Sequence, residues 1–347
     1  AIEKGNEYLK SKQNPEGYWA QPSYPALTAL AVTAYMRDPA NQGKPVPEYI
    51  RKGYDFILKS QKEDGSIFNR GMSSYNTAVC MMALLAANKE EYAPAILKGR
   101  AYLIKQQNHF APDNPYNGGI GYGDKQAPPI ADLSNTSLAL EAIYYSQKLA
   151  KDGKYGEQPD LDWNAATEFI NRCQQTPAVN KEPWVSNDKS QLGGFVYRPG
   201  VSSARDKKSA AFDKAEPPKA YGSMTYAGMQ SLIYANVDKN DPRVKLALKW
   251  LENSYSLDEN PGMGVQGLYY YYQAMSKALS AMGIDTLTLE NGRKVDWRDE
   301  LANKLISIQK SDGSWVNTNN RWWEADPVLV TSYCVLALEQ LYHSIPR

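Results

Sequence analysis

The sequence predicts an all-α protein: an α/α toroid of six helical hairpins that spans residues 1–347 as a single domain. The turn phrase "QKEDGS" at residues 61–66 returns as "QKSDGSW" at residues 309–315, which indicates that one helical unit has been copied along the chain. Segments with one apolar stripe alternate with segments that are apolar nearly all round, as outer and inner helices do. The last pair is as apolar as the middle pairs, which favours closure into a ring over an open array with polar ends.

Each predicted hairpin has a first segment that ends near a Gln, a turn that contains Gly, and a second segment rich in Ala, Leu and Tyr. In chain order the pairs are residues 1–13 and 25–37, 50–61 and 75–87, 95–107 and 132–146, 163–174 and 221–235, 242–255 and 267–281, and 297–309 and 326–342.

The first segments are expected to be outer helices, because each carries one apolar stripe at helical spacing, as with Ile50, Tyr54 and Ile57. The second segments, such as "TAVCMMALLAA" at 77–87, are apolar or small on all sides and are expected to be inner helices. In the turns we expect Gly to end the outer helix, Ser or Asp to cap, and the aromatic residue to seal the gap between hairpins.

Three stretches interrupt the pattern. Residues 198–220 are polar and charged, and are expected to form a loop near the mouth of the ring that is less ordered than the rest. Residues 256–266, "SLDENPGMGVQ", replace the usual turn. Residues 284–296 alternate around Asn-Gly and predict a short β-hairpin with a two-residue turn.

Composition excludes several classes of protein. The net charge is +1 and no stripe of Lys and Arg stands out, so we expect no nucleic-acid partner. The longest apolar runs fall short of the roughly 20 residues that span a bilayer, so no transmembrane segment is predicted. The chain begins "AIEKG" without Met, which we interpret as export to the periplasm or outside the cell, with a cytoplasmic location as the alternative. The sequence leaves the oligomeric state open.

The cysteines and histidines limit the chemistry. Cys80, Cys173 and Cys334 cannot all pair, and two of them lie in apolar segments, so no disulfide framework is expected. The only histidines are His109 and His343, and neither lies at the start of an inner segment. A His-based triad and a His-rich metal site are therefore not expected, and we predict neither a metal nor a cofactor.

The turn phrases and the inner segments resemble those of a known family over almost the whole chain. The phrases at 61–66 and 309–315, each followed by an inner segment of the T-x-x-x-x-x-A-L kind, resemble the repeats of the squalene cyclase and protein prenyltransferase β-subunit superfamily. More closely, "DLSNT" (132–136), "YGSMTYAG" (221–228) and "DENPGMGVQGLYYYY" (258–272) resemble bacterial prenyltransferase/squalene-oxidase-repeat proteins. The resemblance implies a toroid and says less about function.

In such a ring all six inner helices start around one mouth, where their positive dipole ends favour anions or carboxylates. The candidate catalytic acids at these starts are Asp132, Glu324 and Asp326. Asp132 and Asp326 also suit helix N-caps, and Pro327 suits a first helical position. For each of these two aspartates, the sequence allows two interpretations: a helix cap or a functional acid.

Two family motifs are incomplete. The cyclases protonate an alkene with Asp-x-Asp-Asp-Thr at an inner-helix start, and this chain has Asp132-Leu-Ser-Asn-Thr136, in which Ser134 and Asn135 replace two of the three acids. The prenyltransferases bind zinc through Asp-x-Cys and a distant His, and no Asp-x-Cys occurs here. The resemblance therefore implies neither a complete cyclase site nor zinc-dependent prenyl transfer.

Aromatic residues near the mouth are the remaining candidates for ligand binding. The four consecutive tyrosines at 269–272 spread around a helix, so at most two face the centre. Tyr rings either stabilise cations, by about 0.5–2 kcal/mol each, or pack with their hydroxyls bonded at the rim. The candidate ligand-binding residues are Tyr75, Tyr221, Tyr226, Tyr269 and Tyr270, with Trp322 and Trp323 as a pair that either stacks on sugar rings or packs between helices, and Asp258 and Glu259 as loop acids or turn formers.

Three functional hypotheses follow. The first is a terpenoid-cyclase-like or isoprenoid-binding protein with an aromatic central cavity. The second is a secreted carbohydrate-active protein, either a polysaccharide lyase or a glycan binder, on a toroid scaffold. The third is a protein-interaction toroid of the complement thioester-domain kind, although the Gly-Cys-Gly-Glu-Gln motif is absent. A deep aliphatic and aromatic pocket favours the first hypothesis, and a shallow polar groove favours the second.

Overall fold

The computed structural model describes residues 1–123, 130–204 and 217–345, and each predicted segment is a helix whose ends lie within two residues of the prediction. The outer helices are α1 (Ile2–Ser11), α3 (Glu48–Lys59), α5 (Ala93–Lys105), α8 (Trp163–Arg172), α10 (Pro242–Asn253) and α12 (Trp297–Ile308). The inner helices are α2 (Pro25–Arg37), α4 (Ser73–Ala86), α6 (Leu133–Tyr145), α9 (Gly222–Tyr234), α11 (Leu268–Met282) and α13 (Pro327–Ser344).

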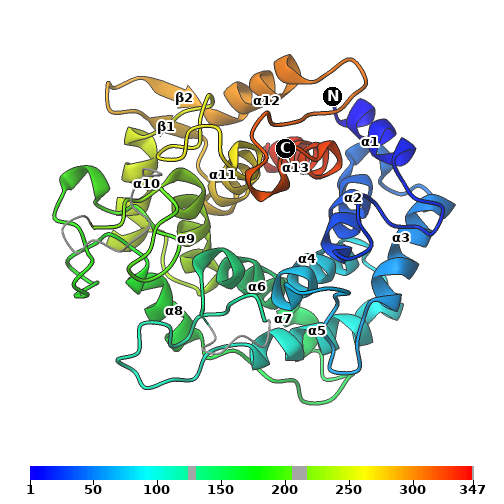
Figure 1. Ribbon diagram of the computed structural model, residues 1–347, viewed down its shortest axis with the longest axis horizontal. Helices are drawn as coiled ribbons and strands as arrows, with labels where there is room; N and C mark the ends of the chain where they lie inside the picture. Colours follow the sequence, from blue (N-terminus) through cyan, green and yellow to red (C-terminus); the bar gives the residue numbers. More distant parts are fainter. Residues whose placement is uncertain (124–129, 205–216, 346–347) are drawn as a thin grey trace.

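The inner helices form a closed ring, because each packs against the next in chain order and α13 packs against α2 (Figure 1). The outer helices lie around this ring. The two kinds of helix differ in burial as their sequences predict: α3 buries one face through Ile50, Gly53, Tyr54 and Ile57, whereas every residue of α9 except Ile233 is buried. The predicted α/α toroid is thus confirmed.

A glutamine at the end of the outer helix ties neighbouring pairs together in five of the six connections. The Gln174 side chain, for example, donates from Nε2 to the carbonyl of Gly193 in its own turn (3.0 Å) and to the carbonyl of Arg243 at the start of the next outer helix (2.9 Å). We call this arrangement the glutamine clamp; it recurs at Gln13, Gln61, Gln107, Gln174 and Gln309.

The turn glycines lie beside the clamps and beyond the ends of the outer helices, which is not where the sequence predicted them. The helix α12 ends at Ile308, whereas Gly313 lies further along the turn at a φ of +88°. A Cβ atom at Gly313 would lie 2.3 Å from the carbonyl oxygen of Lys4 in α1. The glycine is therefore required for a left-handed backbone and for close approach to the next outer helix, and the prediction that it ends the helix is wrong.

The seam between the last and first pairs closes with the same contacts. Gln309 Nε2 donates to the carbonyl of Ala1 (3.0 Å), as the other clamp glutamines do to their following outer helix. The last and first inner helices are also joined: Arg37 on α2 donates to Gln340 Oε1 on α13 (2.6 Å), and His343 Nε2 lies 2.9 Å from the carbonyl of Arg37. The first and last helices, α1 and α13, consequently pack against each other (Figure 1).

The fifth connection is built differently and has no glutamine clamp. Here the hydroxyls of Tyr271 and Tyr272 on α11 donate to the carbonyls of Ser256 (2.9 Å) and Leu257 (2.6 Å). Two of the four consecutive tyrosines therefore hold the atypical 256–266 loop instead of facing the centre of the ring.

Smaller elements complete the described chain. They are α7 (Gln147–Lys151), the 3-10 turns η1 (Pro39–Asn41), η2 (Glu90–Tyr92), η3 (Lys189–Gln191) and η4 (Arg321–Trp323), and the antiparallel strands β1 (Thr286–Thr288) and β2 (Lys294–Asp296). The predicted β-hairpin is confirmed, but the prediction that its turn has two residues is wrong. The Leu289 N–H donates to the Arg293 carbonyl and the Gly292 N–H to the Leu289 carbonyl, which leaves a three-residue loop with Gly292 at φ +80°.

Three further predictions concern the loop at 198–220, the cysteines and membrane-spanning helices. Of the loop predicted at 198–220, residues 205–216 lie outside the described residues, and the flanking residues form neither helix nor strand. All three cysteines are buried and free. Across the described parts of the chain, each helix is too short or too polar to cross a bilayer.

The glutamine clamp predicts a stability cost at a buried position. Gln174→Leu should lower the free energy of unfolding by about 1–3 kcal/mol, because the Gly193 and Arg243 carbonyls lose their donor inside the protein. Urea denaturation measures the change, with the exposed Gln42→Leu as control, for which we expect a change within about 0.5 kcal/mol. Equal stability of Gln174→Leu and the wild type would contradict this role of the clamp.

Candidate functional site

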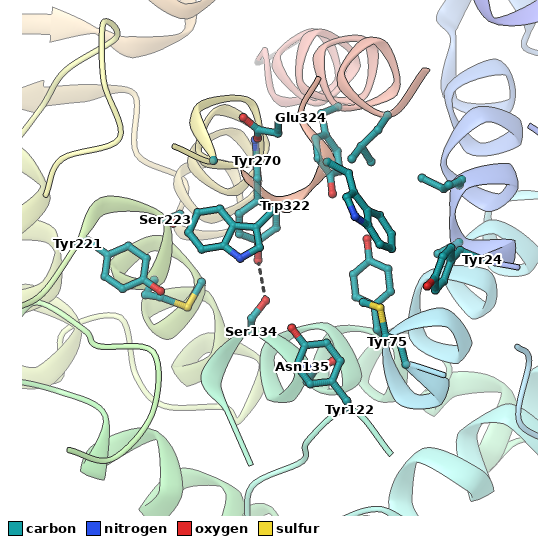
Figure 2. Close-up of a pocket in the computed structure, with 18 residues that line it drawn as sticks. Tyr24, Tyr75, Tyr122, Ser134, Asn135, Tyr221, Ser223, Tyr270, Trp322 and Glu324 are labelled. Carbon is teal, nitrogen blue, oxygen red and sulfur yellow. Dashed lines mark hydrogen bonds between the residues drawn. The ribbon is translucent and has the colours of Figure 1, made fainter. Parts of the chain in front are cut away.

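A cavity of about 350 Å³ opens at the end of the ring where the inner helices start. Its lining residues are Tyr333 and residues from the first turns of all six inner helices and from the segments that precede them, and their side chains converge on one space (Figure 2). A volume of this size lies within the usual range for small-molecule sites, which is about 300–1,000 Å³.

Three tyrosines form the floor of the cavity. Tyr75 on α4, Tyr270 on α11 and Tyr333 on α13 line the cavity on one side, and on the other they line a chamber of about 70 Å³ deeper in the ring. The Tyr270 and Tyr333 ring centroids lie 6.1 Å apart. Burial raises the pKa of all three hydroxyls, so they remain neutral donors in an aromatic surface.

Two exposed tryptophans form part of the rim. Trp322 and Trp323 are 46% and 41% exposed, and both have left-handed backbone angles, with φ of 55° and 64°. Such angles are unfavourable for bulky residues, at about 1–3 kcal/mol each, and persist where surrounding contacts hold them. Trp323 packs on Tyr24 with ring centroids 4.7 Å apart, and the Arg321 guanidinium lies 4.4 Å from the centre of the Trp322 ring.

One wall of the cavity is polar but uncharged. Ser134 Oγ lies 3.5 Å from the Tyr270 hydroxyl, as Figure 2 shows by a dashed line. Asn135 donates from its backbone N and from Nδ2 to the carboxylate of Asp132, both at 2.8 Å. The Asn135 Oδ1 atom is buried and has no hydrogen-bond partner among the described residues.

Asp132 is the N-cap of α6 and lies behind Asn135, outside the residues that line the cavity. Its carboxyl is 2% exposed. Burial raises its pKa to about 6, against the opposing effect of the hydrogen bonds from Asn135. Asp132 thus performs the capping role, and its polar contact with the cavity passes through the Asn135 amide.

Glu324 lines the cavity, yet its carboxylate is engaged by the neighbouring helix. It is 1% exposed, and its Oε1 accepts the backbone N–H groups of Tyr269 (3.1 Å) and Tyr270 (2.9 Å), while Oε2 accepts from Asn317 Nδ2 (2.7 Å). Burial raises the pKa of Glu324, and these donors oppose the rise. Glu324 therefore caps α11 from the segment that precedes α13.

Asp326 caps its own helix and faces a different space. Its Oδ1 accepts the Val328 N–H at 2.8 Å, at the start of α13, and Pro327 occupies the first helical position as predicted. Asp326 lines a second groove, beside Trp323, of about 210 Å³.

The structure brings six predicted residues into the cavity lining, namely Tyr75, Tyr221, Tyr270, Trp322, Trp323 and Glu324. Tyr226 is fully buried in the wall against Tyr271, with ring centroids 5.6 Å apart, and the Tyr269 hydroxyl donates to the Val316 carbonyl (3.3 Å).

The two loop acids lie outside the cavity, at the protein surface. Asp258 is 89% exposed and pairs with Lys304 on α12 at 2.6 Å, and the Lys304 ammonium holds the pKa of Asp258 below its usual value. Glu259 is exposed.

Sequence reasoning did not select several lining residues, including Tyr24, Met72, Tyr122, Leu329 and Tyr333. Tyr24 directly precedes α2, and Leu329 lies in the first turn of α13, so both share the signal that identified the other candidates. Tyr333 lies further into α13, where only the direction of the side chain toward the ring centre distinguishes it from other apolar positions. Among the described residues, no group of three or more His, Cys, Asp or Glu side chains is placed to hold a metal ion.

No protein-family model and no curated protein sequence matches this chain. Solved structures do match it, and they share the toroid. The type II terpene cyclase MstE from Scytonema, in complex with its substrate geranylgeranyl dihydroxybenzoate, has a TM-score of 0.57 at 10% identity, and the match covers 99% of this chain and 97% of the cyclase.

Two further matches carry different chemistries. Protein geranylgeranyltransferase-I from Candida albicans, complexed with GGPP, has a TM-score of 0.60 at 14% identity, covering 99% of this chain and 91% of that chain. The GH76A α-1,6-mannanase from Salegentibacter sp. HEL1_6 has a TM-score of 0.60 at 10% identity, covering 99% and 98%. The chain therefore has the fold of the squalene cyclase and prenyltransferase β-subunit superfamily, a fold that glycan-active proteins also use, and at these identities the likeness concerns the fold.

The raised pKa of Asp132 predicts a pH-dependent stability. Between pH 4 and 6 the folded state binds more protons at Asp132 than the unfolded state, so this contribution to stability is present at low pH and is lost as pH rises through about 6. Asp132→Asn, which keeps a capping oxygen, should gain stability relative to the wild type between about pH 4.5 and pH 7, by about 2 kcal/mol. Urea denaturation at both pH values provides the measurement, and an unchanged difference would contradict the assignment.

The capping contacts of Glu324 predict a second stability effect. Glu324→Gln should lower the free energy of unfolding by about 1–3 kcal/mol, because a neutral amide replaces the charged acceptor of the first N–H groups of α11. Hydrogen exchange should become faster at Tyr269 and Tyr270 and remain unchanged at the start of α4. Uniform or absent acceleration would mean that Glu324 does not cap α11.

Proposed function

We propose that the protein binds an apolar, unsaturated small molecule of the isoprenoid type in the cavity at the inner-helix starts. The observation that carries the proposal is the character of the lining: tyrosine and tryptophan rings with Leu27, Met72, Met224 and Leu329, and no Lys, Arg or His among the described lining residues. Aromatic faces favour contact with alkene and methyl groups, and burying apolar area contributes about 25 cal/mol per Å².

The proposal concerns binding and not protonation. A cyclase needs a free acid directed into the cavity, and Ser134 and Asn135 stand where the cyclase motif has two of its acids. The single described carboxylate in the lining, Glu324, accepts backbone N–H groups and the Asn317 amide. Because both of its oxygens accept hydrogen bonds, protonating Glu324, as a general acid requires, would place a donor against these donors and weaken the cap of α11.

A glycan is the second candidate ligand, and the observation that favours it is the exposed tryptophan pair at the rim. An inactive variant of the Salegentibacter mannanase was solved with α-1,6-mannotriose, at a TM-score of 0.58 and 11% identity to this chain. Hydrolysis of a glycan commonly uses two carboxyl groups that flank the scissile bond. The described cavity lining holds one, so this alternative is a glycan binder and not a hydrolase.

A variant that fills the cavity tests the proposal. We expect the wild type to bind geranylgeraniol, and Leu329→Trp to bind it at least about tenfold more weakly, because the indole occupies the space beside Tyr333. Titration calorimetry measures both affinities, and circular dichroism checks the fold, since overpacking costs about 1–3 kcal/mol.

The matched control places the same new side chain on the outer surface. Ile306 is 55% exposed on α12, so Ile306→Trp should keep the wild-type affinity within about twofold. Absence of binding to the wild type, or equal binding by the wild type and a folded Leu329→Trp protein, would refute the proposal. Binding of α-1,6-mannotriose in place of the isoprenoid alcohol would favour the glycan alternative.

A further inference from the structure

The groove beside Trp323 is a separate space that adjoins the aromatic cavity. The cavity and the groove share Leu27, Trp323 and Leu329 in their linings, so the two spaces adjoin at these three side chains. The groove, at about 210 Å³, adds more than half of the cavity's volume of about 350 Å³.

The chemistry of the groove differs from that of the cavity. Besides the three shared residues, the groove is lined by Gln21, Asn320 and Asp326. The side chains of Gln21 and Asn320 are exposed, and their amides make no hydrogen bond within the described chain. Asp326 uses Oδ1 for the Val328 N–H, and its Oδ2 accepts no hydrogen bond from the described residues. Two amides and one carboxylate oxygen beside an indole face offer several acceptors and donors at short spacing.

We propose, on the basis of the isoprenoid-binding function above, that the ligand is amphipathic: an apolar chain lies in the cavity and an uncharged, polyhydroxylated head group, such as a sugar, lies in the groove. The hydroxyl groups of the head bond to Gln21, Asn320 and Asp326, and the Trp323 ring packs against one face of it. A single ligand thereby occupies both spaces.

Charge distinguishes this head group from a diphosphate. The described linings of the cavity and the groove contain two carboxylates, Glu324 and Asp326, and no Lys, Arg or His. The nearby Arg321 is engaged, since its Nη1 donates to Gln266 Oε1 at 2.6 Å and its guanidinium covers Trp322. An anionic head would lie near like charges without a partner, whereas hydroxyl groups can donate to both carboxylate and amide oxygens.

Gln21 and Asn320 are exposed, so replacing their side chains should change the binding of the head group without changing the stability of the fold. Gln21 and Asn320 lie in turns, where the Gln21 carbonyl accepts the Tyr24 N–H and the Asn320 carbonyl accepts the Trp323 N–H. These are backbone bonds, so replacing the side chains by alanine keeps them. The double variant should therefore fold normally, and any effect on binding comes from the lost amides.

The experiment compares four ligands by titration calorimetry: farnesol, farnesyl β-glucoside, farnesyl diphosphate and α-1,6-mannotriose. The wild type should bind the glucoside at least about tenfold more tightly than farnesol, and should bind the diphosphate no more tightly than farnesol. The double variant Gln21→Ala/Asn320→Ala should lose this preference and keep its affinity for farnesol within about twofold. The control Asn240→Ala, an exposed change at the connection between α9 and α10, should retain the preference.

Several results would overturn the inference, and they are distinguishable from failure of the proposed function. If farnesol binds and the glucoside binds no better, or if the double variant keeps the preference, the cavity proposal stands and the head-group site falls. Tighter binding of farnesyl diphosphate than of the glucoside would likewise refute the head-group site and leave the cavity proposal intact. If farnesol does not bind at all, the proposed function fails, and tight binding of mannotriose alone would replace both proposals with a glycan site.

Discussion

The glutamine clamp is the interaction on which the ring depends. A toroid of helical hairpins needs each pair to fix the position of the next, and apolar packing alone does not set that position uniquely. In five connections a Gln side chain bridges two backbone carbonyls, one in its own turn and one at the start of the next outer helix. The bridge ties the turn of one pair to the first residues of the next outer helix and specifies a constant offset between pairs, so that the sixth pair meets the first.

The same constraint places the functional site. Each clamp glutamine lies in the connection that leads into an inner helix, and the first turns of the inner helices surround one space. The departures from the clamp then shape that space. In the fifth connection Tyr271 and Tyr272 hold the loop, so Tyr270 is the tyrosine of the run that lines the cavity. In the sixth, Trp322 and Trp323 have left-handed backbone angles, and both line the cavity.

Six helix starts around one cavity create a demand for acceptors, and acids of this chain meet it at three of them. Asp132, Asp326 and Glu324 each accept backbone N–H groups at such starts, and Glu324 does so for the neighbouring helix. The accepted N–H groups favour the carboxylate form, burial opposes them by raising the pKa of Asp132 and Glu324, and the hydrogen bonds occupy carboxylate oxygens that would otherwise be open to a ligand. The cavity that remains is aromatic, with an uncharged polar wall at Ser134 and Asn135. This division favours recognition of a ligand over proton transfer to it.

The sequence by itself determined the helix pairs, their order and the closure of the ring, because a periodic apolar pattern and a repeated turn phrase are local properties. It also located the end of the ring where the site lies, and six of the residues that line the cavity. Only the tertiary structure decided which acids are caps, because a helix in one pair is capped by Glu324 from the next, 54 and 55 residues along the chain from its Tyr270 and Tyr269 donors. It also separated Tyr270 from its three neighbours and joined Trp323 to both the cavity and the groove, since these outcomes depend on side-chain direction and on contacts between segments distant in sequence.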